Sequence, residues 1–151
     1  MKMEHQRQGG FLIAKIHQVA GRIFARLLKE HQIEEINPAQ GRIMFVLWRQ
    51  DGVPINELAK RTALGKSTLT SMLDRLEQAG YLVRVPSSKD RRQILIKRTD
   101  KDRALERVYV RASQEMTKLF YADFSPTEID RFERDLQRIL DNLTAFESGA
   151  R

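Results

Sequence analysis

Apolar residues recur at intervals of three and four positions along most of the chain, which is the spacing of one buried face of an α-helix. A stripe of this kind lies within residues 10–32, and a longer one runs from Ile129 to Phe146. The pattern predicts six helices: the first over about residues 10–32, the second after Asn37, the third after Pro54, the fourth before Gly80, the fifth after Thr99 and the sixth after Ser125.

Short polar residues mark the starts of two of these helices. Residues 37–40 are Asn-Pro-Ala-Gln, and residues 125–128 are Ser-Pro-Thr-Glu. An Asn or Ser side chain before a helix can accept a backbone N–H, and Gln or Glu three residues later can return the bond. Both segments therefore predict helix starts that carry Pro at the first helical position.

Two segments lack the helical spacing and are rich in β-branched residues. Residues 81–85 and 93–97 predict strands, and the polar connection between them is too long for a two-residue hairpin. This loop is expected to project as a wing beside the fourth helix. The fold class predicted is mainly α with a small β-hairpin wing: a winged helix-turn-helix with a dimerisation layer of terminal helices.

The predicted organisation has three parts within 151 residues, a length typical of one domain. Residues 1–36 are expected to supply the N-terminal helix of the dimerisation layer. Residues 37–99 are expected to form the winged helix-turn-helix, and residues 100–151 the C-terminal helices of the same layer. The terminal helices flank the central part from both ends of the chain.

Positive charge is concentrated in the central part. The whole chain has a formal net charge of +7. Between Pro54 and Arg98 there are ten lysines and arginines against four acidic residues, a surplus of six. A merely solvated basic surface would not need this clustering. The distribution therefore favours a polyanion as partner.

Several classes of function are excluded or disfavoured by composition. The chain has no cysteine, which excludes disulfides, thiolate metal sites and thiol redox sensing. Three dispersed histidines predict no metal site, and no catalytic triad, phosphate-binding glycine loop or HExxH motif occurs. We therefore expect no cofactor and no enzymatic activity. No apolar run reaches the length of a membrane span, and no signal peptide is recognised, so a cytoplasmic location is expected.

The fourth helix carries two Ser and two Thr in its first six residues, and the wing loop is basic. Capping and local backbone bonding account for one or two of these hydroxyls. Short hydroxyl side chains at a helix start can contact base edges in a major groove, while a basic loop can reach phosphates or a narrow minor groove. The combination predicts a nucleic-acid interface.

These segments resemble the MarR/SlyA family of winged-helix transcription factors along nearly the whole chain. Leu64 to Leu82 resembles the family's recognition helix and first wing strand, and Ile55 to Ala59 resembles the helix before the turn. Asp90-Arg91-Arg92, followed by Ile94-Leu95-Ile96 and Thr99, resembles the wing signature. The resemblance implies an obligate homodimer that binds palindromic double-stranded operator DNA, acts as a repressor and is released by a small aromatic effector.

The resemblance also implies roles for individual residues. Arg92 would enter the minor groove, Asp90 would hold its guanidinium, and the hydroxyls of the fourth helix would face the major groove. The expected DNA-binding residues are Lys66, Ser67, Thr68, Thr70, Ser71, Arg75, Lys89, Asp90, Arg91 and Arg92.

Two further sets are predicted outside the DNA-binding part. The expected dimer contacts are Ile13, Ile129, Phe132, Leu136, Ile139 and Leu143. An effector pocket is expected to be lined by Ile16, His17, Arg22, Phe24, Met44 and Phe45. For each of these last residues, ordinary core packing is the alternative.

The sequence departs from the family pattern at three positions. Gly65 stands where a Ser cap is common, Pro54 where a Thr cap is common, and Asp102 where a Gly is frequent. A different class of function also stays open, because winged helices serve as protein-docking modules without sequence-specific DNA binding. Steep salt dependence on duplex DNA and preference for a palindrome would distinguish the two.

Overall fold

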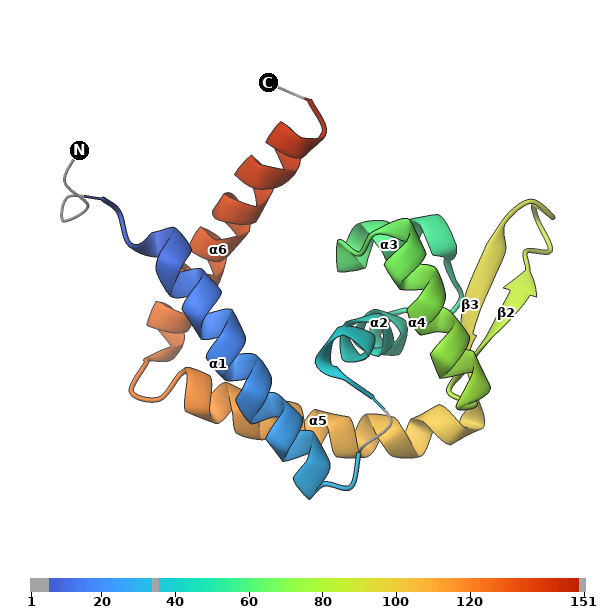
Figure 1. The fold of residues 1–151 in the computed structure, drawn as a ribbon, viewed down its shortest axis with the longest axis horizontal. Coiled ribbons are helices and arrows are strands. Elements are labelled where there is room, and N and C mark those ends of the chain that lie inside the picture. Colours follow the sequence, from blue (N-terminus) through green and yellow to red (C-terminus); the bar gives the residue numbers. More distant parts are fainter. Residues whose placement is uncertain (1–5, 34–35, 150–151) are drawn as a thin grey trace. The chain divides into compact units, whose positions relative to one another are not determined.

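A computed structural model describes residues 6–33 and 36–149, with Pro38 and Ala39 described by backbone alone. The chain divides into two compact units, residues 1–116 and 117–151. The elements in chain order (Figure 1) are α1 (Gly9–Glu30), α2 (Pro38–Arg49), β1 (Val53–Pro54), α3 (Ile55–Thr62), α4 (Lys66–Gln78), β2 (Leu82–Pro86), β3 (Ile94–Arg98), α5 (Asp100–Phe120) and α6 (Pro126–Glu147).

The predicted fold class is confirmed, with one addition to the sheet. The sequence predicts two strands, whereas the structure has three antiparallel strands in the order β1-β3-β2. In β1, Val53 pairs with Ile96, while the β2–β3 ladder runs from Leu82 opposite Arg98 to Pro86 opposite Ile94. A strand of two residues is too short to show a period of two. The strand β1 is therefore recognisable only through its pairing with β3.

The core of the first unit is aliphatic and lies mainly among α2, α3, α4 and the sheet. Leu58, Leu69, Leu73 and Leu76 are almost completely buried, and Ile96 joins them from β3. Burial of each such side chain stabilises the folded state by about 1.5–3 kcal/mol. The leucines of α4 recur at the helical spacing, so the other side of that helix faces solvent.

Both predicted capping boxes are present. The Gln40 backbone N–H donates to Asn37 Oδ1 at 2.7 Å, and the Gln40 side chain accepts from the Asn37 N–H at 3.0 Å. Ser125 and Glu128 exchange the corresponding bonds at the start of α6. The backbone and hydroxyl of Ser125 hold the pKa of the Glu128 carboxyl below its ordinary value. By contrast, α4 follows Gly65 with no side-chain cap.

An aromatic contact joins α1, α2 and α5 within the first unit. The ring of Tyr109 meets Phe24 edge-on at 5.2 Å and Trp48 at 5.0 Å between centroids. Burial raises the pKa of the Tyr109 hydroxyl to about 12. Gly41 on α2 is the close neighbour of this ring, because a Cβ at that position would lie 1.9 Å from the Tyr109 hydroxyl oxygen. The packing of α5 against α2 therefore depends on glycine at position 41.

The second unit contains the end of α5, the turn after it and α6, and aromatic side chains from all three segments pack together. Tyr121 contacts Phe120, Phe124 and Phe132, with centroid separations of 5.0–6.2 Å, and its hydroxyl donates to Glu133 at 2.8 Å. Burial and the neighbouring carboxylate raise the pKa of Tyr121 to about 12. No described residue of α6 is buried in this chain alone. Within the part of the chain that the structure describes, no helix is long and apolar enough to cross a bilayer.

Candidate nucleic-acid interface

The exposed side of α4 presents the side chains predicted to read DNA. Lys66, Ser67, Thr68 and Arg75 are all exposed there, as are the two hydroxyl residues between them, Thr70 and Ser71. Most of them surround one shallow hollow, lined by Lys66, Ser67, Thr70, Ser71 and Asp74. The burial of the α4 leucines on the opposite side produces this orientation directly.

One hydroxyl of this surface is already used within the helix. Thr70 Oγ1 donates to the Lys66 carbonyl oxygen at 2.9 Å. Its proton is therefore engaged, and its oxygen remains available as an acceptor for a base or sugar group. The hydroxyls of Ser67 and Ser71 are exposed and can act as donor or acceptor toward a base edge.

Arg84 on β2 holds the wing against α4. Its guanidinium donates to Asp74 at 2.6 Å, Glu77 at 3.2 Å and the Thr70 carbonyl oxygen at 3.4 Å. Its backbone N–H also donates to Glu77 at 3.2 Å. Two carboxylates on the helix are thereby paired with a cation, which reduces their repulsion of phosphate. This role of Arg84 was not predicted from the sequence, because its partners come from different elements.

The wing loop is ordered by a buried hydroxyl. Ser87 is 7% exposed, and its oxygen accepts the backbone N–H groups of Lys89 at 3.2 Å and Asp90 at 3.3 Å. The Ser87 N–H donates to the Gln93 carbonyl oxygen at 2.9 Å, closing the loop. The role of Ser87 was not predicted either, although a Ser in a polar loop is a recognisable turn signal.

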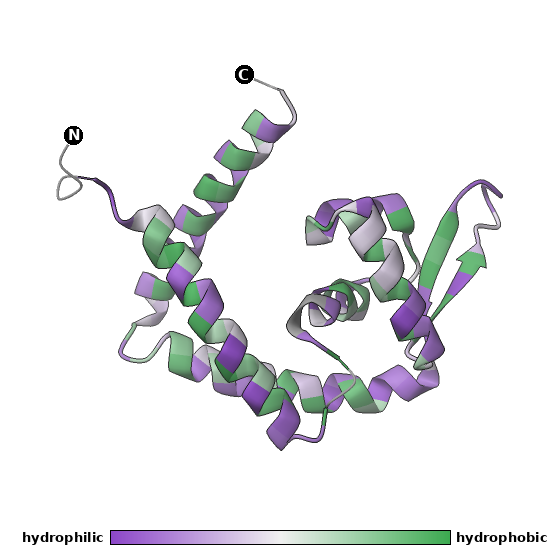
Figure 2. Ribbon diagram, in the orientation of Figure 1, coloured by the Kyte–Doolittle hydropathy of each residue, from purple (hydrophilic) through white to green (hydrophobic). Residues whose placement is uncertain are grey.

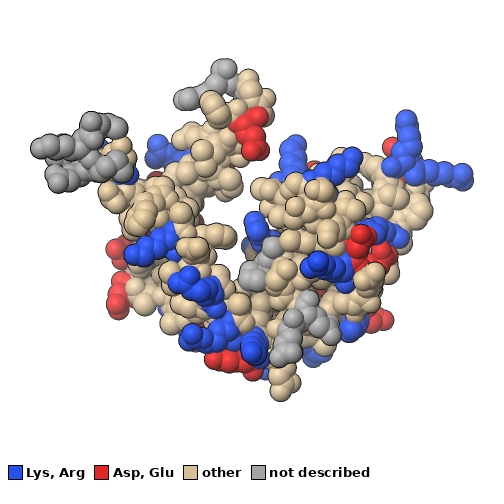
Figure 3. All heavy atoms as spheres, in the orientation of Figure 1, with Lys and Arg blue, Asp and Glu red and all other residues tan. Residues whose placement is uncertain are grey.

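Asp90 and Arg92 are paired at the tip of this loop. The Arg92 backbone N–H donates to Asp90 Oδ1 at 3.0 Å, and the Arg92 Nε lies 3.5 Å from the same oxygen. The Arg92 side chain is nonetheless 93% exposed. Figure 3 shows basic side chains gathered at the tip of the wing, beyond the helices. The Arg92 guanidinium is held through its Nε and is otherwise exposed, so it is suited to contact a phosphate or a DNA groove.

The root of the wing contains a buried charged cluster. Trp48 Nε1 donates to both carboxylate oxygens of Asp102 at 3.0 Å, and Arg98 Nε donates to Asp102 at 2.5 Å. Burial raises the pKa of the Asp102 carboxyl, and the bonds from Trp48 and Arg98 oppose that shift. The sequence identified Asp102 as a departure from the family pattern, but nothing local to it indicated burial.

The residues predicted to line an effector pocket lie in different environments. Met44 is completely buried, whereas Ile16, His17 and Arg22 are exposed on α1. Phe24 packs against Tyr109, and Phe45 is exposed beneath the Arg49 guanidinium at 4.6 Å. The structure does not gather these six residues around one cavity that it describes, so the pocket assignment stays a prediction.

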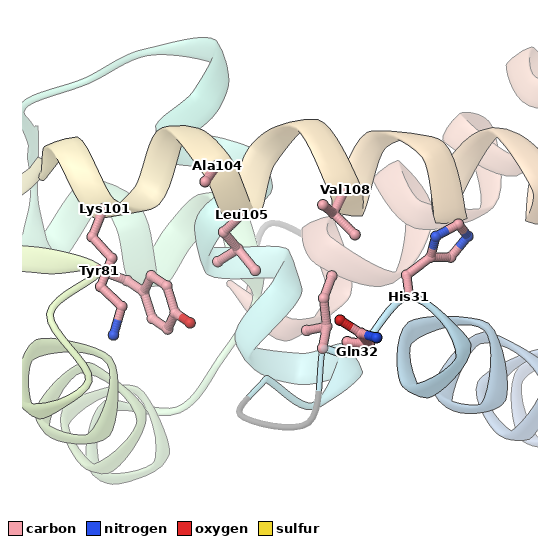
Figure 4. A pocket seen from close by; sticks show the side chains of 8 residues that line it. His31, Gln32, Tyr81, Lys101, Ala104, Leu105 and Val108 are labelled. Carbon is pink, nitrogen blue, oxygen red and sulfur yellow. The ribbon is translucent and has the colours of Figure 1, made fainter.

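A different hollow lies alongside α5 in the first unit (Figure 4). Its volume is about 450 Å³, and it is lined by His31, Gln32, Ile33, Tyr81, Lys101, Ala104, Leu105 and Val108. His31 Nε2 lies 3.0 Å from Glu115 Oε1. Lys101 Nζ lies 4.8 Å from the centre of the Tyr81 ring and donates to the Ala79 carbonyl oxygen. The hollow thus combines an apolar wall with the Lys101 ammonium at its edge.

No set of three His, Asp or Glu residues suited to a metal ion occurs among the described residues. The geometry instead presents a helix with an exposed hydroxyl-rich surface, a tight turn before it and a basic loop beside it. The elements α3, α4, β2 and β3 therefore form a winged helix-turn-helix.

Comparison with known proteins assigns this domain to a family. The model described as MarR family matches residues 36–94, so this part of the chain is a MarR-family domain. The HTH-type transcriptional regulator TtmR of Methylorubrum extorquens is 37% identical over 86 residues, which are 57% of this chain. The matched region spans 43% of TtmR, less than half of that relative's length.

Two solved structures share the fold. A cysteine-to-serine mutant of Escherichia coli MarR complexed with operator DNA gives a TM-score of 0.76 at 26% identity, covering 87% of this chain and 92% of that one. BpsR of Bordetella bronchiseptica, whose DNA binding is regulated by 6-hydroxynicotinic acid, gives a TM-score of 0.80 at 22% identity, covering 93% of this chain and 97% of BpsR. At that identity BpsR supports the fold alone.

Proposed function

We propose that the protein is a non-enzymatic, sequence-specific regulator of transcription that binds palindromic double-stranded DNA as a homodimer. The observation that carries this function is the exposed hydroxyl and cationic surface of α4 beside a wing whose Arg92 is 93% exposed. MarR, a structural neighbour, was crystallised with operator DNA. The same action on this chain would place it in the cytoplasm.

Operator selection from random duplexes tests this function. We expect two half-sites related by a two-fold axis and separated by about 10–10.5 bp, because each recognition helix must enter one major groove on the same side of the duplex. Affinity for the selected site should fall steeply as salt rises. Recovery of no preferred sequence, with flat salt dependence, would instead support a protein-docking module.

Dimerisation is proposed from two exposed apolar surfaces, one on α1 in the first unit and one on α6 in the second. Figure 2 shows hydrophobic residues repeating along both helices. Ile13 on α1 is 43% exposed, and on α6 Leu143 is 63% and Phe146 70% exposed. Apolar surface of this extent on a monomer is typical of an interface, and a second copy offers an identical surface through two-fold symmetry. The predicted contacts Ile129, Phe132, Leu136 and Ile139 lie on the same helix.

Charge placed on this surface should separate the subunits. Ile139→Asp/Leu143→Asp is expected to change the mass in light scattering from twice 17.6 kDa to 17.6 kDa at micromolar concentration, because two carboxylates would be buried without partners. Asn142→Asp/Gln137→Asp adds the same charge to exposed polar positions of α6 and should leave the dimer intact. A wild-type protein that is monomeric while fully folded would contradict the proposed dimer.

We further propose that the protein is a repressor released by a small aromatic acid, which would bind in the hollow beside α5. The apolar wall formed by Ile33, Leu105 and Val108 suits a ring, and Lys101 at the edge suits a carboxylate. The ligand of BpsR, 6-hydroxynicotinic acid, is of this chemical class. An effector must bind one conformation better than the other to change DNA affinity.

Filling the hollow tests this effector site. We expect a phenolic or heteroaromatic acid to raise the thermal midpoint of the wild-type protein and weaken its operator binding. In Ala104→Trp both effects should be lost, because the indole would occupy the hollow that Ala104 lines. Arg103→Trp, at an exposed neighbouring position, serves as the control of equal size. An acid that acts equally on wild type and Ala104→Trp would bind elsewhere.

A further inference from the structure

The buried cluster at the root of the wing joins elements that are distant in sequence. Asp102 is 0% exposed at the start of α5, Trp48 comes from the end of α2, and Arg98 is the last residue of β3. Arg98 also donates through Nη2 to Glu106 at 2.5 Å. One guanidinium therefore bridges two carboxylates of α5, and one of those carboxylates receives a second donor from α2.

Such a cluster is an expensive way to stabilise a fold. Removing a carboxylate and a guanidinium from water costs several kcal/mol per ion, so buried ion pairs are often no better than apolar packing. A buried ion pair does fix the orientation of its side chains, since each donor must meet a particular oxygen. In this cluster both oxygens of Asp102 are occupied by donors. The orientation of Arg98 relative to α5 and α2 is thereby restricted.

Arg98 is also held through its backbone. Its N–H donates to Asp51 Oδ1 at 2.8 Å, and Asp51 accepts the Gly52 N–H at the same oxygen. On the other side, Arg98 pairs with Leu82 at the start of the β2–β3 ladder. This ladder ends at Pro86 and Ile94, where the wing loop begins. A change in direction at Arg98 would be transmitted along five paired positions to the loop.

We propose that Asp102 is a positioning residue for DNA binding, which acts through Arg98 to set the direction of the wing and so the reach of Arg92. This inference rests on the proposed function. It states that Asp102 contributes to operator affinity although it does not contact DNA. Trp48 supports the role by fixing the carboxylate from the side of α2. Glu106 supports it by holding the second nitrogen of the same guanidinium.

The main test is a double-mutant cycle between the root and the tip of the wing. Asp102→Asn keeps the size of the side chain but presents an NH₂ group to one of two donors, Trp48 or Arg98. Arg98→Lys is the second variant, because it keeps the charge but loses the fork that reaches Asp102 and Glu106. Asp100→Asn, two residues earlier on the exposed surface of α5, is the control for the change in net charge.

We expect Asp102→Asn and Arg98→Lys each to weaken operator binding about tenfold, and Asp100→Asn to leave it unchanged or slightly stronger. Arg92→Ala should cost the wild-type protein about tenfold or more, but the Asp102→Asn protein no more than about threefold. Such coupling is the signature of action through the wing. Equal costs of Arg92→Ala in both backgrounds, or unchanged affinity in both root variants, would overturn the proposal.

Amide hydrogen exchange on the free protein separates failure of this proposal from failure of the proposed function. In Asp102→Asn the amides of β3 and the wing loop should exchange faster, while those of α4 near Leu73 should not change. This result does not depend on DNA. If the wild-type protein selects no operator, the proposed function fails, and unaltered exchange in the wing would by itself overturn the role of Asp102.

Discussion

Arg92→Ala is expected to weaken binding to the selected operator by about 1–3 kcal/mol, a loss of roughly five- to 150-fold in affinity. The guanidinium is 93% exposed at the wing tip and is steadied only on its inner edge by Asp90. Its loss should therefore disturb the DNA contact without disturbing the folded protein. Titration of labelled operator duplex, with the thermal midpoint measured in parallel, checks both halves of this expectation.

Lys89→Ala provides the comparison within the same loop. Lys89 is exposed, and only its backbone N–H is fixed, by Ser87. A flexible ammonium contacts phosphates without regard to sequence, so its loss should weaken all duplexes to a similar extent and reduce the salt slope by about one unit. Arg92→Ala should instead affect the operator more than an unrelated duplex. Unchanged operator affinity in both variants would show that the wing does not contact DNA.

The second large effect is expected on stability. Gly41→Ala should lower the free energy of unfolding by about 1–3 kcal/mol, the usual cost of overpacking a filled core. The added Cβ would lie 1.9 Å from the Tyr109 hydroxyl oxygen and 2.6 Å from its Cζ. The ring has little room to move, because Phe24 and Trp48 contact it from two elements. Urea denaturation of wild type and variant measures the change.

Two further variants separate this clash from other consequences of adding a methyl group. Gly21→Ala places the same group on α1, where no atom other than its chain neighbours and its own helix backbone lies within 4 Å of the new Cβ, and should stabilise by up to about 1 kcal/mol through helix propensity. In a Tyr109→Leu background, Gly41→Ala should cost much less than in the wild type, because the colliding ring is absent. If Gly41→Ala and Gly21→Ala have the same effect, the close approach does not constrain the fold.

The local elements of the fold could be predicted from the sequence because their determinants lie within a few residues. Asn37 and Gln40, like Ser125 and Glu128, bond across three positions. The exposed surface of α4 follows from the spacing of Leu69, Leu73 and Leu76 alone. The exposed residues of α4 at the candidate DNA interface were expected from the same periodicity, whereas the roles of Asp90 and Arg92 in the wing were expected from the family resemblance.

Contacts between distant segments were not predictable in this way. Trp48 and Asp102 are separated by 54 residues, and His31 and Glu115 by 84. The strand β1 exists only because Val53 lies beside Ile96, and the hollow beside α5 combines residues from the segment after α1, from α5 and from the turn after α4. The effector residues predicted from α1 and α2 do not line that hollow.

The helical pattern, the wing and the hydroxyl-rich surface of α4 were predictable without the structure, because periodicity and capping operate within one or two helical turns. The clustering of positive charge was predictable from composition alone. Three features depend instead on contacts between distant elements: Arg84 joins the wing to α4, Gly41 accommodates Tyr109, and Asp102 is buried between Trp48 and Arg98. The stability of a buried charge depends on the groups that surround it in space, and the residues next to it in the sequence do not indicate which groups those are.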